Sequence, residues 1–431
     1  MKVAYIKNRK YSDLHKNKEN GKMVKYLYPS IECLKNTIQH TKYTDKKLYE
    51  TALKLESIFR YLNIECNVVS ANSGKFICTY EVKLRKAEYV RKIQRKKEEI
   101  KELLNVEKIE IEAPVDWTKS TLKLMVLEED NSPIFLKEIL LEYAGKKWLE
   151  FSIGKNVYGE NVWIDYTEKY SWLIAGMTGT GKSMFVHSFI LSLLYRVTPE
   201  AVKIIIIDTN SVEYNLYNSI PHMLLPVITD WKKAIGVMEW CILEMNERYE
   251  KMLRYNIKEI EHFNAWIENN SAMGLNKFPH IFIIIDDYYG ISKNAKNEME
   301  TRICKVAQKG GKAGIHLMLV TQRASAEIVG SSIKENIPNR IAFSVESAID
   351  SRMILEENGA EKLRKNGAMI LKNMISKKKE QLQGIFVSEE EITEVVSDVI
   401  EKCAYSARTA HPFQRNGAPF RFKLSKAQQV Y

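Results

Sequence analysis

The sequence predicts an α/β protein whose main domain is built on a parallel sheet. First, short runs rich in Ile, Leu and Val alternate with helix-length segments from residue 171 onward. Second, a glycine-rich turn directly follows the first of these runs and precedes a helical pattern. Third, the chain has 431 residues, enough for two to three domains with a core each.

The alternation places the elements of the main domain. Strands are expected at Trp172–Ala175, Lys203–Asp208, His280–Asp286, Leu317–Thr321 and Arg340–Ser344. Apolar residues recur at helical spacing in three long segments, so helices are expected at Lys182–Tyr195, Trp231–Tyr255 and Glu298–Lys309.

The remaining sequence divides into three further regions. Residues 1–45 are basic and polar and predict an arm. Residues 46–150 predict a smaller α/β accessory domain, with a helix at 46–62, strands at 66–70 and 75–80, and a charged helix between 83 and 104. The main domain is expected over 151–402. Residues 403–431 carry five cations, five aromatic residues and no acid, and predict a tail.

Composition narrows the class of protein. Lys and Arg number 65 against 54 Asp and Glu, giving a net charge of +11, which suits a polyanion partner or simply a lysine-rich composition. The six cysteines are scattered, so neither a zinc site nor a disulfide framework is expected. Without an apolar leader or a run of ~18 apolar residues, we expect a cytoplasmic protein, unless a partner recruits it to a membrane.

The glycine-rich turn matches the phosphate-binding motif G-x-x-x-x-G-K-[ST], known as Walker A. Its backbone N–H groups would surround the phosphates of ATP at the start of a helix. Lys182 would reach the β- and γ-phosphates, and the Ser183 hydroxyl would coordinate Mg²⁺. The expected nucleotide-binding residues are Gly176, Thr178, Gly179, Thr180, Gly181, Lys182 and Ser183. A glycine-rich turn without a ligand is the weaker alternative.

Two other strand ends carry polar residues suited to the same chemistry. The run Ile281–Ile285 ends in two acids, of which Asp286 is expected on the magnesium side and Asp287 as the general base for the attacking water. A strand that ends in a helix cap is the alternative. After Leu317–Thr321, the amide of Gln322 is expected to contact the γ-phosphate or to orient the water.

Several longer stretches resemble the FtsK/SpoIIIE family of DNA translocases. The stretches that carry the resemblance are Ile153–Asn156, Tyr217–Leu224, Gly314–Arg323, Ile333–Val345, Ile349–Leu355 and Gly359–Leu363. Together they extend the resemblance over roughly residues 51 to 397. It implies a RecA-like P-loop NTPase core behind the accessory domain and a hexameric ring that uses ATP hydrolysis to move along double-stranded DNA.

The resemblance also marks departures from the family pattern. Such rings use an arginine from a neighbouring subunit, but the family's A-R-A-A-G stretch reads Gly310–Gly314 here and lacks it. Lys312, Arg323, Arg340 and Arg352 are the candidates that remain open. The family's Asp-Glu pair is Asp286-Asp287, and its D-P-K stretch is Asp208–Asn210, so we expect slower or differently tuned hydrolysis.

The expected biological role follows from the same resemblance. We find no counterpart of the membrane-spanning region or the winged-helix domain of the chromosomal members, which favours the stand-alone motors of mobile elements. DNA transfer or conjugation is therefore the expected role, with a relaxase or a membrane transfer complex as partner. The alternatives are an ATPase motor of type VII-like protein secretion and a nucleotide-binding ring component with little turnover.

Overall fold

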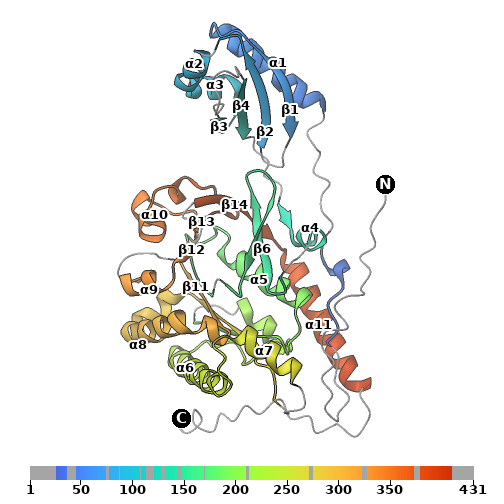
Figure 1. Cartoon of the computed structure of the whole chain (residues 1–431), viewed down its shortest axis with the longest axis vertical. Helices are drawn as coiled ribbons and strands as arrows, with labels where there is room; N and C mark the ends of the chain where they lie inside the picture. The colour runs from blue at the N-terminus through green and yellow to red at the C-terminus, as the bar shows by residue number, and fades with distance from the viewer. Residues whose placement is uncertain are drawn as a thin grey trace.

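The computed structural model describes residues 26–35, 45–73, 77–86, 88–106, 108–112, 121–127, 133–143, 147–168, 170–209, 213–270, 275–322, 328–372 and 379–409. These residues form a small unit and a large unit, which lie at opposite ends of the long axis in Figure 1. Most of the expected arm and tail, and the candidate Arg323, lie outside the described residues.

The small unit is an antiparallel sheet of four strands in the order β1-β2-β4-β3, packed with three helices. Its elements are α1 (Asp45–Tyr61), β1 (Cys66–Ser73), β2 (Ile77–Leu84), α2 (Tyr89–Arg95), α3 (Lys97–Leu104), β3 (Lys108–Glu112) and β4 (Thr121–Leu127). The single charged helix expected between 83 and 104 is instead the end of β2 and two short helices. Alternating burial explains the difference, because Val82 and Leu84 point into the core as a strand requires.

The large unit contains a sheet of ten strands among the described residues, in the order β7-β6-β14-β13-β12-β8-β11-β10-β9, with β5 beside β14. The five predicted strands are present as β8 (Ser171–Ala175), β9 (Val202–Asp208), β10 (His280–Asp286), β11 (Ile315–Thr321) and β12 (Asn339–Phe343), and they run parallel. The other strands are β5 (Ile134–Phe135), β6 (Glu150–Asn156), β7 (Asn161–Asp165), β13 (Ala368–Lys372) and β14 (Lys379–Phe386).

The predicted parallel sheet is thus only one part of a mixed sheet. Antiparallel pairing joins β12 to β13, β13 to β14, β14 to β6 and β6 to β7. Strands β6, β7 and β14 carry mixed polar and apolar residues, so their sequences lack the continuous apolar runs of the parallel strands.

Helices cover both faces of the parallel strands. One face packs against α5 (Lys182–Arg196), η2 (Glu213–Ser219) and α11 (Glu389–Thr409). The other face packs against α6 (Trp231–Leu253), α7 (Ile260–Asn269), α8 (Tyr288–Lys309) and α9 (Ser331–Asn336). Helix α10 (Ala348–Leu355) packs with β12 in a separate, smaller hydrophobic cluster. Successive residues of β10 show the division, because Phe282 faces the α5 side and Ile283 faces the α8 side. No helix among these residues is long and apolar enough to cross a membrane.

The structure draws three region borders differently from the sequence. Part of the expected arm packs on the large unit, where Tyr26 is buried and its hydroxyl donates to the Leu194 carbonyl at 2.9 Å. Residues 134–143 and 147–150 also belong to the large unit, because β5 pairs with β14 and α4 (Leu136–Leu141) packs beside it. Helix α11 continues to Thr409, past the border expected at 402.

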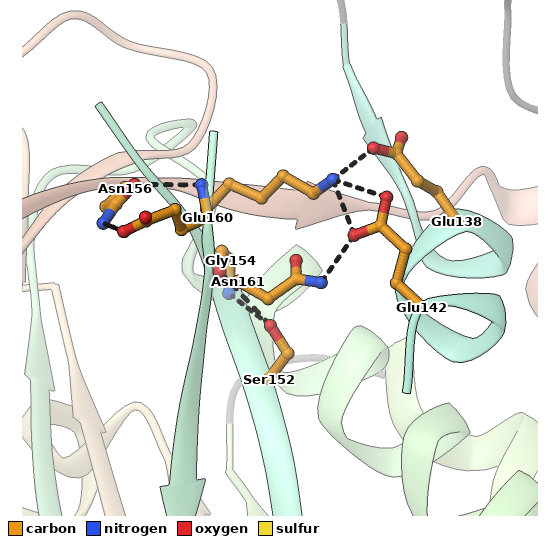
Figure 2. A network of polar contacts seen from close by, with 8 residues as sticks. Glu138, Glu142, Ser152, Gly154, Asn156, Glu160 and Asn161 are labelled. Atoms are coloured by element: carbon orange, nitrogen blue, oxygen red, sulfur yellow. Dashed lines mark hydrogen bonds and ion pairs between the residues drawn. The ribbon is translucent and has the colours of Figure 1, made fainter. Parts of the chain in front are cut away.

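A buried polar joint holds β6 to α4 (Figure 2). The Lys155 side chain lies in the large unit with only 4% exposure and forms ion pairs with Glu138 and Glu142, the latter at 3.0 Å. Asn161 of β7 donates to the same Glu142 carboxylate at 2.7 Å. The stretch Ile153–Asn156, which carries part of the family resemblance, therefore has a structural function at the antiparallel side of the sheet.

Candidate nucleotide site

The polar residues predicted from three separate motifs lie at one edge of the sheet. Because β8, β9, β10 and β11 are parallel, their C-terminal ends meet there, with Thr321 opposite Ala175 and Asp286 opposite Asp208. The segments that follow β8, β9, β10 and β11 begin with Gly176, Thr209, Asp287 and Gln322, respectively. In open α/β sheets, this is the edge at which ligands bind.

The glycine-rich loop is held in place by its neighbours. Gly181 has a φ of +114°, and a Cβ there would lie 2.9 Å from the Gly367 Cα, so the conformation and the contact both require glycine. The Gly367 N–H donates to the Thr180 carbonyl at 2.9 Å, and the Met177 N–H donates to the Ser344 carbonyl at 2.9 Å. The loop is therefore shaped by segments more than 150 residues away along the chain.

Lys182 folds back into the loop. Its Nζ atom donates to the Met177 carbonyl at 2.6 Å, and the residue is 6% exposed. Burial lowers the pKa of Lys182 to about 8, although the carboxylates of Asp286 and Asp287 favour the charged form. The amine thus lies within the loop that surrounds phosphates in proteins with this motif.

The two acids after β10 have different surroundings. Asp286 accepts a hydrogen bond from the Tyr214 hydroxyl at 2.6 Å and another from the Asp287 N–H at 2.9 Å. Asp287 has a left-handed backbone, with a φ of 59°, and its Oδ2 atom is buried without a partner among the described residues. Burial raises the pKa of both carboxyls. The Asp287 carboxylate is therefore a better proton acceptor than the carboxylate of an exposed aspartate.

Gln322 lies beside the loop, as its strand position predicts. Its Oε1 atom accepts a hydrogen bond from the Thr178 hydroxyl at 2.9 Å. The structure therefore brings together Lys182, the two acids and Gln322 at the same sheet edge, although they come from three motifs far apart in the sequence.

Sequence reasoning missed the contribution of η2, which follows β9. Glu213 lies 3.0 Å from the Nε2 atom of His187, and the Nδ1 atom of His187 lies 2.7 Å from the Tyr217 hydroxyl. Its contact with His187 lowers the pKa of Glu213, and the Ser183 hydroxyl lowers it further. An acid a few residues after a predicted parallel strand was the signal available in the sequence.

The donor set fits a magnesium ion bound with nucleotide. Ser183 offers a hydroxyl and Asp286 a carboxylate, and magnesium prefers oxygen ligands shared with phosphates. The buried hydroxyl of Thr209 and the Oδ2 atom of Asp287 have no partner among the described residues, and so have capacity for further hydrogen bonds at this edge. A bound magnesium ion would neutralise charge on the phosphates.

The contacts of the candidate cations show which of them are available to act on a neighbouring subunit. Arg340 is 5% exposed, and its Nη1 atom donates to the Ile354 carbonyl at 3.0 Å and to Glu356 at 2.9 Å, so it is committed within its own chain. Arg352 is exposed and donates to Asn358 at 2.7 Å, and Lys312 pairs with Glu259 at 3.2 Å. Among the described candidates, Arg340 is therefore the least available to a neighbouring subunit.

Comparison with protein families and curated proteins gives consistent matches. Residues 144–326 match the model of the FtsK/SpoIIIE family, and residues 28–122 match the model of the FtsK alpha domain. The DNA translocase FtsK of Clostridium tetani is 37% identical over 386 residues, which are 88% of this chain and 52% of that protein. The chain spans about half the length of the curated relatives it matches.

Two solved structures resemble the fold. The pCW3 conjugation coupling protein TcpA, with ATPγS, has a TM-score of 0.54 and 16% identity, and the match covers 81% of this chain and 99% of that one. The cytoplasmic domain of the type VII secretion ATPase EccC of Thermomonospora curvata has a TM-score of 0.53 and 19% identity, over 62% of this chain and 34% of that one. At these identities the likeness establishes the fold alone, and it confirms the predicted core of the P-loop ATPase type.

Proposed function

Since the chain carries the FtsK alpha and FtsK/SpoIIIE domains and belongs to the FtsK/SpoIIIE family, we propose that it is an ATP-driven translocase of double-stranded DNA. The observation that carries the proposal is the meeting of Lys182, the Asp286–Asp287 pair and Gln322 at one edge of the parallel sheet. Such an edge can bind a nucleoside triphosphate and activate water beside it.

Each residue of the site has a proposed role in ATP hydrolysis. The backbone of Gly176–Gly181 and the Lys182 amine bind the phosphates, with the Ser183 hydroxyl and Asp286 on the magnesium side. Asp287 accepts the proton of the attacking water, because its raised pKa suits a general base. Gln322 orients that water or senses the γ-phosphate from the strand beside the loop.

We further propose that the protein acts as a hexameric ring in the cytoplasm, in DNA transfer or conjugation of a mobile element. In such a ring, Lys312 and Arg352 are the exposed candidates among the described residues for a cation supplied to a neighbouring subunit. The net charge of +11 supports DNA binding mainly through phosphates. A relaxase or a membrane transfer complex is the partner that this role requires.

The test is steady-state ATPase of the full chain with and without linear duplex DNA, at low and high salt. We expect duplex DNA to stimulate turnover strongly and high salt to remove the stimulation. Lys182→Ala should abolish turnover, because Lys182 lies within the loop proposed to bind the phosphates. Lys305→Ala is the matched control, since Lys305 is exposed near the far end of α8, and it is expected to keep the stimulated rate.

The other outcomes separate the alternatives. Turnover that depends on Lys182 but ignores DNA would favour an ATPase that acts on protein, as in type VII secretion. An absence of turnover, with nucleotide still bound, would favour a nucleotide-binding ring component. Either result contradicts the proposed DNA translocase.

A further inference from the structure

The 3-10 helix η2 places a tyrosine against the magnesium-side acid. Tyr214 is the second residue of η2 and is fully buried. Its hydroxyl donates to the Oδ2 atom of Asp286 at 2.6 Å, across 72 positions of the sequence. This short distance is typical of a hydrogen bond from a hydroxyl to a carboxylate.

The Asp286 carboxylate is held at both of its oxygen atoms. Tyr214 occupies Oδ2, and the Asp287 N–H donates to Oδ1 at 2.9 Å. Each carboxylate oxygen has a second lone pair, so these bonds orient the group and leave capacity for a further ligand. The side chain is therefore oriented by the protein itself, without help from a nucleotide.

The aromatic ring alone does not explain a tyrosine at this position. The Tyr214 ring packs in the core on the α5 side and lies 5.1 Å from the His187 ring, contacts that a phenylalanine could also make. The Tyr214 hydroxyl, unlike the buried hydroxyl of Tyr166, has a hydrogen-bond partner among the described residues, and that partner is the acid of the candidate site. The hydroxyl therefore serves the site rather than the packing.

We propose that Tyr214 is a positioning residue, which aims the Asp286 carboxylate toward the magnesium shell of the bound nucleotide. The inference rests on the proposed function, because it assumes that this site binds nucleotide with magnesium. Tyr214 acts through Asp286 and does not itself contact the nucleotide. Removal of its hydroxyl should weaken the response to magnesium and leave magnesium-free binding of nucleotide largely unchanged.

The experiment uses the full chain and mant-ATP, a fluorescent ATP analogue, titrated with magnesium chloride and without DNA. In Tyr214→Phe, we expect the magnesium concentration for half-maximal tightening of mant-ATP binding to rise about tenfold, the scale of a lost hydrogen bond to a charged group. Tyr166→Phe is the matched control, because Tyr166 is also buried in this core but its hydroxyl has no partner among the described residues. Its magnesium response should match that of the wild type.

A double-mutant cycle separates positioning from a general structural role. In an Asp286→Asn background, the added Tyr214→Phe change should no longer alter the magnesium response, since its effect passes through the carboxylate. An equal effect in both backgrounds, or a Tyr214→Phe response equal to that of the wild type, would overturn the inference. Thermal unfolding without nucleotide identifies a variant that fails to fold, and Tyr214→Leu, which also lacks the hydroxyl and is smaller, then replaces it in the cycle.

The binding measurement distinguishes this inference from the proposed function. If magnesium does not tighten mant-ATP binding to the wild type, the inference fails together with the assigned site. If the tyrosine effect is present but ATPase ignores DNA, only the translocase proposal fails.

Discussion

At the scale of single residues, burial decides which groups respond to pH. His222 is fully buried, donates from Nε2 to the Val197 carbonyl at 3.0 Å and packs edge-on against Tyr26. Burial lowers the pKa of His222 to about 3, whereas an unfolded histidine has a pKa near 6.5. Since the unfolded chain binds this proton first, the fold loses stability as the pH falls from 6.5 toward 3. We predict that His222→Gln, which retains a donor, weakens this dependence.

Urea unfolding at pH 7, 6 and 5 checks this prediction. The histidine should account for about 2 kcal/mol of lost stability between pH 7 and 5, at roughly 1.4 kcal/mol per pH unit below the unfolded pKa. The variant should be less stable at pH 7 but lose less on acidification. Parallel pH curves for the two proteins would show that His222 does not titrate in this way.

At the scale of elements, the joint between β6 and β14 depends on close backbone contact. Gly154 has a φ of +149° at the bulge in β6, and a Cβ there would collide with the Gln383 carbonyl of β14. We predict that Gly154→Ala lowers the free energy of unfolding by about 2 kcal/mol or more, because backbone strain and a clash combine. Gly179→Ala is the control, since its φ of +74° brings strain but its Cβ would meet open space.

Chemical denaturation of the two alanine variants makes the comparison. The control is expected to lose only about 1 kcal/mol, the cost of the left-handed conformation alone. Equal losses at the two positions would mean that the strands separate easily, and that Gly154 is required only for its backbone conformation.

At the scale of the whole molecule, the N-terminal residues 26–35 pack against the C-terminal helix α11. Glu391 of α11 is 1% exposed and accepts from the Lys35 N–H and the Ser388 N–H, both at 2.8 Å. The Ser30 N–H donates to Asp398 further along the same helix at 2.6 Å. We predict that Glu391→Ala lowers the free energy of unfolding by about 2 kcal/mol, since it leaves backbone donors without their acceptor.

Limited proteolysis and thermal unfolding test this joint together. Trypsin should cleave after Lys35 faster in Glu391→Ala than in the wild type, because the segment loses its anchor on α11. Glu394→Ala, an exposed position on the same helix, should behave as the wild type. Unchanged cleavage in Glu391→Ala would show that the other contacts of the segment are sufficient.

The sequence alone determined the parts of this protein that are contiguous in the chain. The phosphate loop, the five parallel strands and the acid pair after β10 could all be predicted, because a loop that surrounds phosphates and a strand buried on both faces impose their residues locally. The family resemblance was confirmed by the matched domains for the same reason.

Only the tertiary structure decided which distant residues meet. The antiparallel strands β6, β7 and β14 lack a strong local pattern, so pairing with their neighbours defines them. The contacts of Thr178 with Gln322 and of Tyr214 with Asp286 depend on the order of strands in the sheet. The commitment of Arg340 depends on where α10 ends. Hydrogen bonding and burial are properties of the packed chain, and no local pattern of residue types specifies them.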